Sequence, residues 1–327
     1  MRTSDFDYDL PQELIAQTPA EPRDAARLLV LDRTSGSLTH SVVRDLPDLL
    51  APGDLLVLNR SRVLPARVKG RLKGGGQAEL LLLRRLAPGH WQTLGRPARR
   101  LRPGDAVQIS ETLQARVVAA HPEGVREVCV DSDSALLAAG SVPLPPYIHN
   151  WSGDPERYQT VYADVEGSAA APTAGLHLTP DLLARLEARG IGIARLVLHI
   201  GLDTFRPVEG EDPAAHAIHQ EWYVVPDDVQ AQVRAAERVV VVGTTTVRAL
   251  ETWAATGRTE GWTDLFIRPG FQFRVVQGLL TNFHLPRSTL LMLVSAFAGR
   301  DRILSAYAEA VRQCYRFYSF GDAMLLL

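Results

Sequence analysis

The sequence predicts an α/β protein in which a largely parallel sheet covered by helices is interrupted by a small β domain. Two observations favour this architecture. Strand and helix patterns alternate in the outer parts of the chain, whereas the middle holds short apolar stretches separated by turns. At 327 residues the chain is long enough for two domains. We therefore place an α/β domain at residues 1–65 and 150–327, and an inserted β domain at residues 66–149.

The outer segments carry clear helix start and stop signals. Thr179, Pro180 and Asp181 form a capped helix start, and Gly190 ends that helix. Further strands are expected at 27–32, 54–58, 191–200 and 239–242, and further helices from Pro226, after Gly243, and twice between 288 and 318.

The inserted segment has the strand spacing of a small barrel or sandwich. Gly74, Gly75 and Gly76 indicate a hairpin turn, and the proline-rich stretch 143–146 indicates a stiff linker that closes the domain. The expected strands are 66–72, 78–83, 91–94, 107–109, 114–119 and 127–130.

Charge is distributed unevenly along the chain. Residues 60–102 hold twelve basic residues and one acidic residue, Glu79, whereas the whole chain has a formal charge of −2. A solvated β surface would explain this segment, and so would a face that binds a phosphate backbone. On the second interpretation, the residues expected to contact the phosphate backbone of a nucleic acid are Arg60, Arg62, Arg67, Lys69, Arg71, Lys73, Arg99 and Arg100.

Composition narrows the class of protein. Hydrophobic residues make up 46% and charged residues 22%, as in ordinary globular proteins. Cys129 and Cys314 are the two cysteines, which excludes thiolate zinc sites and fits a reducing cytosol. The N-terminus lacks the apolar core of a signal peptide, and no apolar run reaches the length of a membrane helix. We expect a cytoplasmic protein.

Polar clusters at predicted strand and helix ends are the candidate site, because the usual nucleotide, hydrolase and zinc motifs are missing. Ligands of open α/β sheets bind beyond the carboxyl ends of strands. Five histidines in these clusters favour one shared pocket. The clusters are 172–177, 199–207, 216–221, 243–248 and 281–289, and their histidines are His177, His199, His216, His219 and His284.

Two of these clusters have alternative interpretations. Gly243 followed by three threonines could present helix amides to an anion, or Thr244 could simply cap the helix. His216, His219 and Glu221 have the spacing of metal ligands if they lie on one helix face. We expect no metal, and assign His219 and Glu221 to acid–base or substrate contacts.

Several longer motifs resemble the S-adenosylmethionine:tRNA ribosyltransferase-isomerase family of queuosine biosynthesis, nearly from end to end. The chain departs from the family pattern at Leu178, Leu202-Asp203, Arg287 and Thr246. Asp203 matters most among these, because an acid beside the pocket could add a general base. The shared motifs are 5–11, 55–59 with 62–63, 158–163, 171–177, 243–245 with 247–248, 251–252, 280–286 and 320–324.

The resemblance implies a three-layer α/β/α main domain interrupted by a β-barrel domain. It also implies transfer and isomerisation of the ribosyl part of S-adenosylmethionine onto 7-aminomethyl-7-deazaguanine at the wobble position of tRNA. Epoxyqueuosine-tRNA forms, and adenine and methionine leave. S-adenosylmethionine is thus a co-substrate, tRNA is the partner, and we expect a monomer.

This chemistry needs a base beside the sulfonium, an acid for adenine departure and an anion site. Two alternatives remain, a non-catalytic RNA-binding module and a metal-dependent hydrolase that uses His216, His219 and Glu221. The residues expected to be catalytic are His177, His199, Asp203, His219 and Glu221; those expected to bind S-adenosylmethionine are Thr173, Gly175, Gly243, Thr244, Thr245, Arg248, Asn282 and His284.

Overall fold

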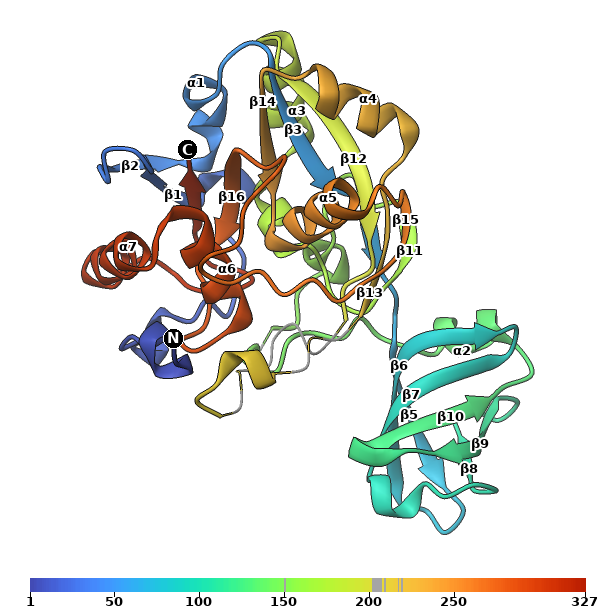
Figure 1. The fold of residues 1–327 in the computed structure, drawn as a ribbon. Helices are drawn as coiled ribbons and strands as arrows, with labels where there is room; N and C mark the ends of the chain where they lie inside the picture. The colour runs from blue at the N-terminus through green and yellow to red at the C-terminus, as the bar shows by residue number, and fades with distance from the viewer. Residues whose placement is uncertain (150, 202–207, 209, 217, 219) are drawn as a thin grey trace. The chain divides into compact units, whose positions relative to one another are not determined.

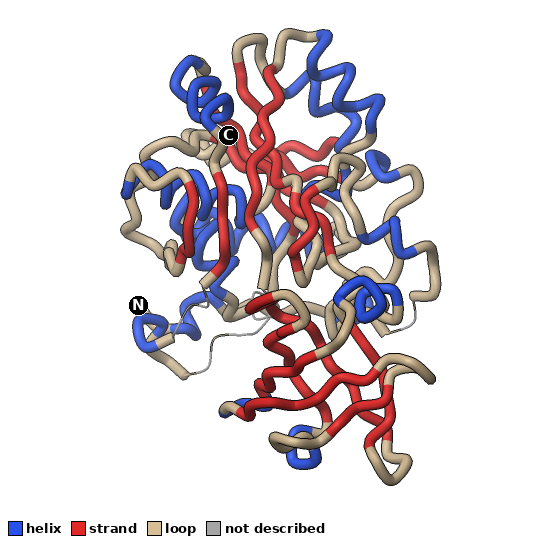
Figure 2. Tube along the Cα trace, turned by 90° about the vertical axis from the view of Figure 1, so that its right-hand side faces the viewer, coloured by secondary structure: helices blue, strands red, loops and turns tan. Residues whose placement is uncertain are grey.

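The computed structural model describes residues 1–327 except 150, 202–207, 209, 217 and 219. It divides into two compact units. The α/β unit contains residues 1–61, 146–165 and 171–327, and the barrel unit contains residues 62–145 and 166–170. Strands flanked by helices build the first unit, and strands dominate the second (Figure 2). No described helix is both long and apolar enough to cross a membrane.

A nine-stranded sheet forms the centre of the α/β unit (Figure 1). Its four central strands run parallel, but antiparallel pairs join β13 to β12, β15 to β13, β17 to β16 and β2 to β1. In spatial order the strands are β15 (Glu260–Thr263), β13 (Glu221–Val224), β12 (Gly192–Leu198), β3 (Asp54–Asn59), β14 (Arg238–Val242), β16 (Gly278–Asn282), β17 (Ala323–Leu326), β1 (Arg27–Leu31) and β2 (Leu38–Val42).

β1 and β17 also pair in parallel, so four of the eight pairs between the described strands are parallel and four are antiparallel. The expectation of a largely parallel sheet is therefore wrong. Two helices rather than one connect β16 to β17, so the chain re-enters the sheet at the edge where β16 ended, with Ala323 beside Asn282, and β17 runs antiparallel to β16. These helices are α6 (Thr289–Ala298) and α7 (Arg300–Arg312), which pack on each other.

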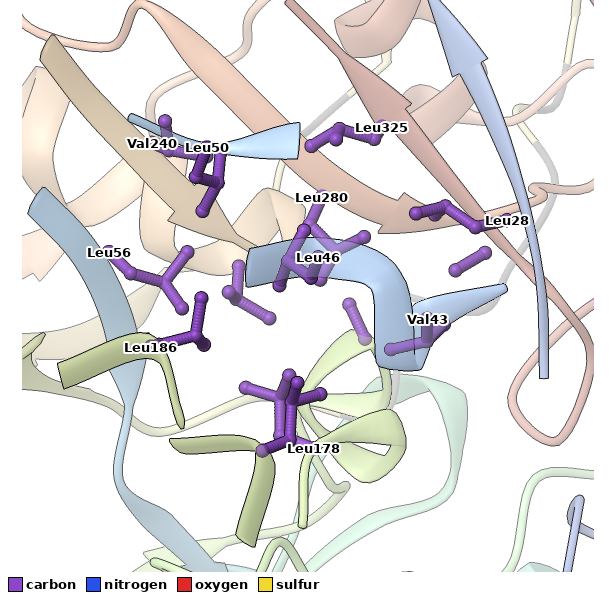
Figure 3. Packing of buried hydrophobic residues seen from close by; sticks show 14 of the residues in the cluster. Leu28, Val43, Leu46, Leu50, Leu56, Leu178, Leu186, Val240, Leu280 and Leu325 are labelled. Atoms are coloured by element: carbon purple, nitrogen blue, oxygen red, sulfur yellow. The ribbon is translucent and has the colours of Figure 1, made fainter. Parts of the chain in front are cut away.

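One face of the sheet is covered by α1 (Leu46–Leu49) and α3 (Pro180–Ala188). Leu46 and Leu186 meet buried side chains of β3, β14 and β16 there (Figure 3). Helix α3 begins as expected, because the Thr179 hydroxyl accepts a hydrogen bond from the amide of Leu182. Helix α5 (Thr244–Thr256) packs on β3, β12 and β14 and covers the other face, and α4 (Asp227–Ala235) packs against β12. The fold class, a three-layer α/β/α domain with an inserted barrel, is confirmed.

The barrel unit is a closed barrel of six antiparallel strands. Side chains such as Val68 and Leu80 point inward, whereas Lys69 and Arg71 are exposed. A Cβ on Gly70 would lie 2.5 Å from Val107 Cγ1, so glycine permits β5 and β8 to approach closely. In barrel order the strands are β10 (Val125–Cys129), β7 (His90–Arg96), β6 (Gln77–Ala87), β5 (Arg67–Leu72), β8 (Ala106–Gln108) and β9 (Gln114–Ala120).

Short elements complete the fold. The three glycines after β5 form the hairpin turn to β6, as expected. Helix α2 (Asp133–Ala138) follows β10, and β4 (Ser61–Val63) pairs with β11 (Val165–Ser168) in a two-stranded ribbon. The turn η8 (Thr173–His177) is a short 3-10 helix that precedes α3.

Candidate active site

Residues from four of the predicted clusters, 172–177, 199–207, 243–248 and 281–289, meet at one edge of the central sheet. Strands β14 and β16 run parallel, with Val242 beside Leu280, and both end at this edge. Residues at and beyond the ends of these strands line a pocket, which is where ligands bind in open α/β sheets. This strand-end pocket is lined by Tyr147, Ala171, Pro172, Thr173, Ala174, Ile200, Gly243, Thr244, Thr245, Thr281, Asn282, Phe283, His284, Leu285, Ser288, Leu290, Tyr318 and Ser319.

Helix α5 presents its N-terminus to this pocket. Gly243 is the N-cap residue, with φ of 89°, a conformation that favours glycine, and it supplies no side chain to cap the first amides. The alternative in which Thr244 is the N-cap is therefore wrong. Thr246 bonds back to the carbonyl of Val242 at 2.6 Å, whereas Thr244 and Thr245 line the pocket. The pocket thus has amide donors and the positive end of a helix dipole.

Asn282 and His284 come from the end of β16. The Asn282 amide nitrogen donates to the carbonyl of Tyr318 at 3.0 Å and lies 3.2 Å from Nε2 of His177. His284 Nε2 lies 2.9 Å from the hydroxyl oxygen of Thr281. The contact between His177 and Asn282 joins the predicted cluster 172–177 to the predicted cluster 281–289.

Burial keeps two of these histidines neutral. It lowers the pKa of His177 to about 4 and the pKa of His284 to about 3. Neither ring is poised to exchange a proton near pH 7, because both are enclosed by protein. Burial also lowers the pKa of His199, whose Nδ1 is buried and has no hydrogen-bond partner within the described part of the chain.

A second pocket shares Leu290 with the strand-end pocket and contains a buried ion pair. The Glu221 carboxylate accepts bonds from the Arg248 guanidinium and from the amide of Gly201, the latter at 3.0 Å. Arg248 also donates to the carbonyls of Leu265 and Thr263. The positive charge of Arg248 is therefore already matched by Glu221, so a ligand anion would have to compete for it.

His216 belongs to this second pocket, but not as expected from the metal hypothesis. It follows the three-residue turn Pro213–Ala215 in extended backbone rather than on a helix, and its ring contacts Phe266 edge-on. His219 lies outside the described residues, as does Asp203. Among the residues that are described, no group of three or more His, Cys, Asp or Glu side chains is arranged to hold a metal ion.

Comparison with known proteins agrees with this geometry. A family model described as queuosine biosynthesis protein matches residues 3–326. The chain belongs to the queuosine biosynthesis protein family. This confirms the resemblance seen in the motifs.

Two curated relatives of this family member are named S-adenosylmethionine:tRNA ribosyltransferase-isomerase. The protein from Symbiobacterium thermophilum is 54% identical over 347 residues, with 100% of both chains covered. The protein from Rubrobacter xylanophilus is 54% identical over 330 residues, which cover 100% of this chain and 98% of the relative. A crystal structure of S-adenosylmethionine tRNA ribosyltransferase from Thermotoga maritima is 41% identical, covers 99% of this chain and 100% of its own, and has a TM-score of 0.59.

Sequence reasoning did not single out the aromatic wall of this family member's pocket. Tyr147 and Tyr318 stack with ring centroids 4.6 Å apart, and the Tyr147 hydroxyl lies 2.5 Å from that of Ser319. The only signal was the position of Tyr318 just before the motif 320–324. Within that motif Asp322 is buried and accepts bonds from the amides of Arg27 and Arg316, which is a structural role.

The residues expected to bind tRNA differ in their surroundings. Arg60 is in the α/β unit and pairs with Asp164, its Nε 2.6 Å from the carboxylate. Arg67 and Arg62 are half-buried, and the Arg67 Nε lies 3.9 Å from Glu79. The remaining five, Lys69, Arg71, Lys73, Arg99 and Arg100, are exposed on the barrel unit.

Lys69 and Arg71 line a groove on the barrel together with Arg96. Gln108 of β8 also lines it, directly beside Arg71 in the strand register. Arg96 was counted in the basic segment but not among the expected tRNA contacts. Arg96 of β7 pairs with Glu79 of β6 in the strand register, and the spacing of residues in the sequence did not predict this pairing.

Proposed function

We propose that this chain transfers and isomerises the ribosyl part of S-adenosylmethionine onto 7-aminomethyl-7-deazaguanine at the wobble position of tRNA. The product is epoxyqueuosine-tRNA, and adenine and methionine are released. The observation that carries the proposal is the match at 54% identity over the whole chain to relatives named for this activity. The pocket at the strand ends, where the shared motifs converge, supports it.

S-adenosylmethionine occupies the strand-end pocket in this proposal. The amides of Thr244 and Thr245 suit the methionine carboxylate, because a helix N-terminus stabilises negative charge. The aromatic pair Tyr147 and Tyr318 and the apolar wall suit the uncharged parts of the molecule. Thr173 and His284 complete the lining, and Gly175 acts through the turn η8 rather than by direct contact.

Proton transfers need groups other than the most buried histidines. A base removes a proton from the carbon next to the sulfonium, and an acid assists adenine departure. His177 and His284 are neutral at pH 7 and are poor proton donors there, given pKa values of about 4 and about 3. We assign these roles to the segment from His199 to Glu221, which includes Asp203 and His219.

The barrel unit holds the tRNA backbone in this proposal. Its exposed basic residues suit phosphates, and binding through them predicts strong salt dependence. Since tRNA is the substrate, we place the reaction in the cytosol, and we propose that a single chain carries it out. Replacing Lys69 and Arg71 together by Gln should weaken tRNA binding and reduce the slope of log affinity against log salt by about two. Arg116→Gln, which removes an exposed charge from β9 outside the groove, is the matched control.

Nucleoside analysis tests the reaction itself. The full chain is incubated with S-adenosylmethionine and tRNA that carries the deazaguanine precursor, and the digested tRNA is analysed by mass spectrometry. We expect a mass gain that corresponds to the epoxycyclopentane unit, with one adenine released per modified tRNA. Transfer RNA with an ordinary guanine at the wobble position should give neither. If the precursor tRNA gains no mass and no adenine is released, the proposal is wrong.

A further inference from the structure

Asn282 has an unpaired carbonyl group at the strand-end pocket. Its side chain is 3% exposed, and its amide nitrogen faces two acceptors, the carbonyl of Tyr318 at 3.0 Å and Nε2 of His177 at 3.2 Å. Oδ1 has no hydrogen-bond partner among the residues that the structure describes, although Asn282 lines the pocket. A buried acceptor without a partner lowers stability, and such groups in native proteins call for an explanation.

Asn59 shows what a purely structural asparagine looks like in the same sheet. It is also buried and also ends a central strand, β3. Its Oδ1 accepts from the amides of Ser61 and Leu198, and its amide nitrogen donates to the carbonyl of Leu198. Asn59 is satisfied by its own chain at both ends of the amide, whereas Asn282 is satisfied at the nitrogen end only.

The surroundings of Asn282 determine which end of its amide stays free. Turning the amide over would direct Oδ1 at the Tyr318 carbonyl, and two acceptors would then face each other. His177 supports the same orientation, because its neutral ring can accept at Nε2. Burial lowers the pKa of His177 to about 4, so the ring is in this neutral form at pH 7.

Donors lie next to this single acceptor. Strands β14 and β16 pair in parallel with Val242 beside Leu280, so Thr244 and Asn282 each lie two residues beyond a matched pair. Neighbouring strands are about 4.8 Å apart. The uncapped amides of Thr244 and Thr245 are therefore within reach of one ligand group that also reaches Asn282. The zwitterion of an α-amino acid fits this arrangement, because it carries an anionic carboxylate and an N–H donor on the same carbon.

We propose that Asn282 Oδ1 accepts a hydrogen bond from the α-ammonium of the methionine part of S-adenosylmethionine. The α-carboxylate of the same methionine part accepts hydrogen bonds from the backbone amides at the start of α5. Asn282 is then a binding residue, and His177 is a positioning residue that holds its amide. This inference rests on the proposed function for the identity of the ligand. It gives the strand-end pocket a specificity for amino-acid zwitterions that a helix N-terminus alone would not have.

Binding by the full chain, measured calorimetrically without tRNA, tests the inference. Three ligands are compared: S-adenosylmethionine, its analogue with 4-(methylthio)butanoate in place of methionine, and its analogue with hypoxanthine in place of adenine. Wild type should bind the analogue that lacks the ammonium about 10- to 100-fold more weakly, as for hydrogen bonds to charged groups. In Asn282→Leu that difference should shrink to about twofold. If Asn282→Leu instead changes the loss of affinity that replacing adenine by hypoxanthine causes, the Asn282 amide contacts the base. That result would overturn the assignment.

Gln230→Met is the matched control. Gln230 is also a buried amide with two donated hydrogen bonds, to the carbonyl of Val225 and to Asp227, but it does not line the pocket. This variant should keep the wild-type pattern. If Asn282→Leu does not fold, the affinities of wild type for the three ligands still test the inference. Equal affinity of wild type for S-adenosylmethionine and for the analogue that lacks the ammonium would refute it. If wild type does not bind S-adenosylmethionine at all, the proposed function fails instead.

The positioning role of His177 has its own test. His177→Phe removes the acceptor that faces the Asn282 amide, and the penalty for losing the ammonium should fall at least several-fold. His177→Gln restores an acceptor and should recover most of the discrimination. A His177→Phe variant that keeps the full ammonium penalty would show that Tyr318 alone holds the amide.

Discussion

Acid should destabilise the α/β unit because two histidines are buried in it without charge. An imidazole in the unfolded chain has a pKa of about 6.5, whereas burial lowers the pKa of His177 to about 4 and that of His284 to about 3. Between these values the unfolded chain binds protons that the folded chain does not. The free energy of unfolding therefore falls as the pH falls below 6.5, and is unaffected by these groups well above it.

The size of the effect follows from the two pKa values. Each pKa unit corresponds to about 1.4 kcal/mol, so lowering the pH from 7 to 5 should cost about 2 kcal/mol for each histidine and about 4 kcal/mol for both. That is a large part of the stability of an ordinary domain. For His177 the charge of Asp322 works against the larger effect of burial.

Urea unfolding at pH 7, 6 and 5 measures this dependence. Trp91 lies in the barrel unit, so a Trp91→Phe background leaves only the four tryptophans of the α/β unit as fluorescent reporters. His284→Gln should lose about 2 kcal/mol less than its parent between pH 7 and pH 5. His149→Gln, which removes an exposed imidazole, is the control. Parallel curves for His284→Gln and its parent would refute the argument that this ring is kept neutral by burial.

Two further substitutions test contacts around the pockets. Arg248→Met should lower the free energy of unfolding by about 3–5 kcal/mol, because Glu221 is 3% exposed and loses its ion-pair partner. Adding Glu221→Leu should recover most of that loss in the same urea assay. An Arg248→Met variant as stable as wild type would contradict this prediction. Gly175→Ala would place a Cβ 2.1 Å from the hydroxyl oxygen of Tyr162, so the turn must shift, with a loss of about 1–3 kcal/mol and at least tenfold in turnover. Tyr162→Phe in the same chain should restore part of the turnover, and full activity of Gly175→Ala alone would show that the turn tolerates the shift.

Much of the local structure could be predicted because local signals carry it. The six barrel strands coincide with the six short apolar stretches, since alternation of inward and outward side chains has a period of two. The cap at Thr179 and the glycine turn after β5 depend on residues within a few positions of each other. The resemblance in the motifs was enough to indicate the family.

The site could be predicted as a set of segments but not as a set of contacts. That Thr244, Thr245, Asn282 and His284 line one pocket follows from strand ends meeting at one edge of a sheet, and the structure brings them together there. The state of each group did not follow. Arg248 was expected to bind S-adenosylmethionine, but its guanidinium is already paired with Glu221, 27 positions away in sequence.

The amino-acid sequence by itself determined which segments become strands, helices and turns, because propensity, capping and period act over a few residues. The tertiary structure decided strand direction at the edges of the sheet, the pairing of His177 with Asn282 across 105 positions, and the neutral state of the buried histidines. Each of these depends on groups that are distant in sequence and come together only when the layers pack, and packing also excludes the water that would otherwise stabilise a charged imidazole.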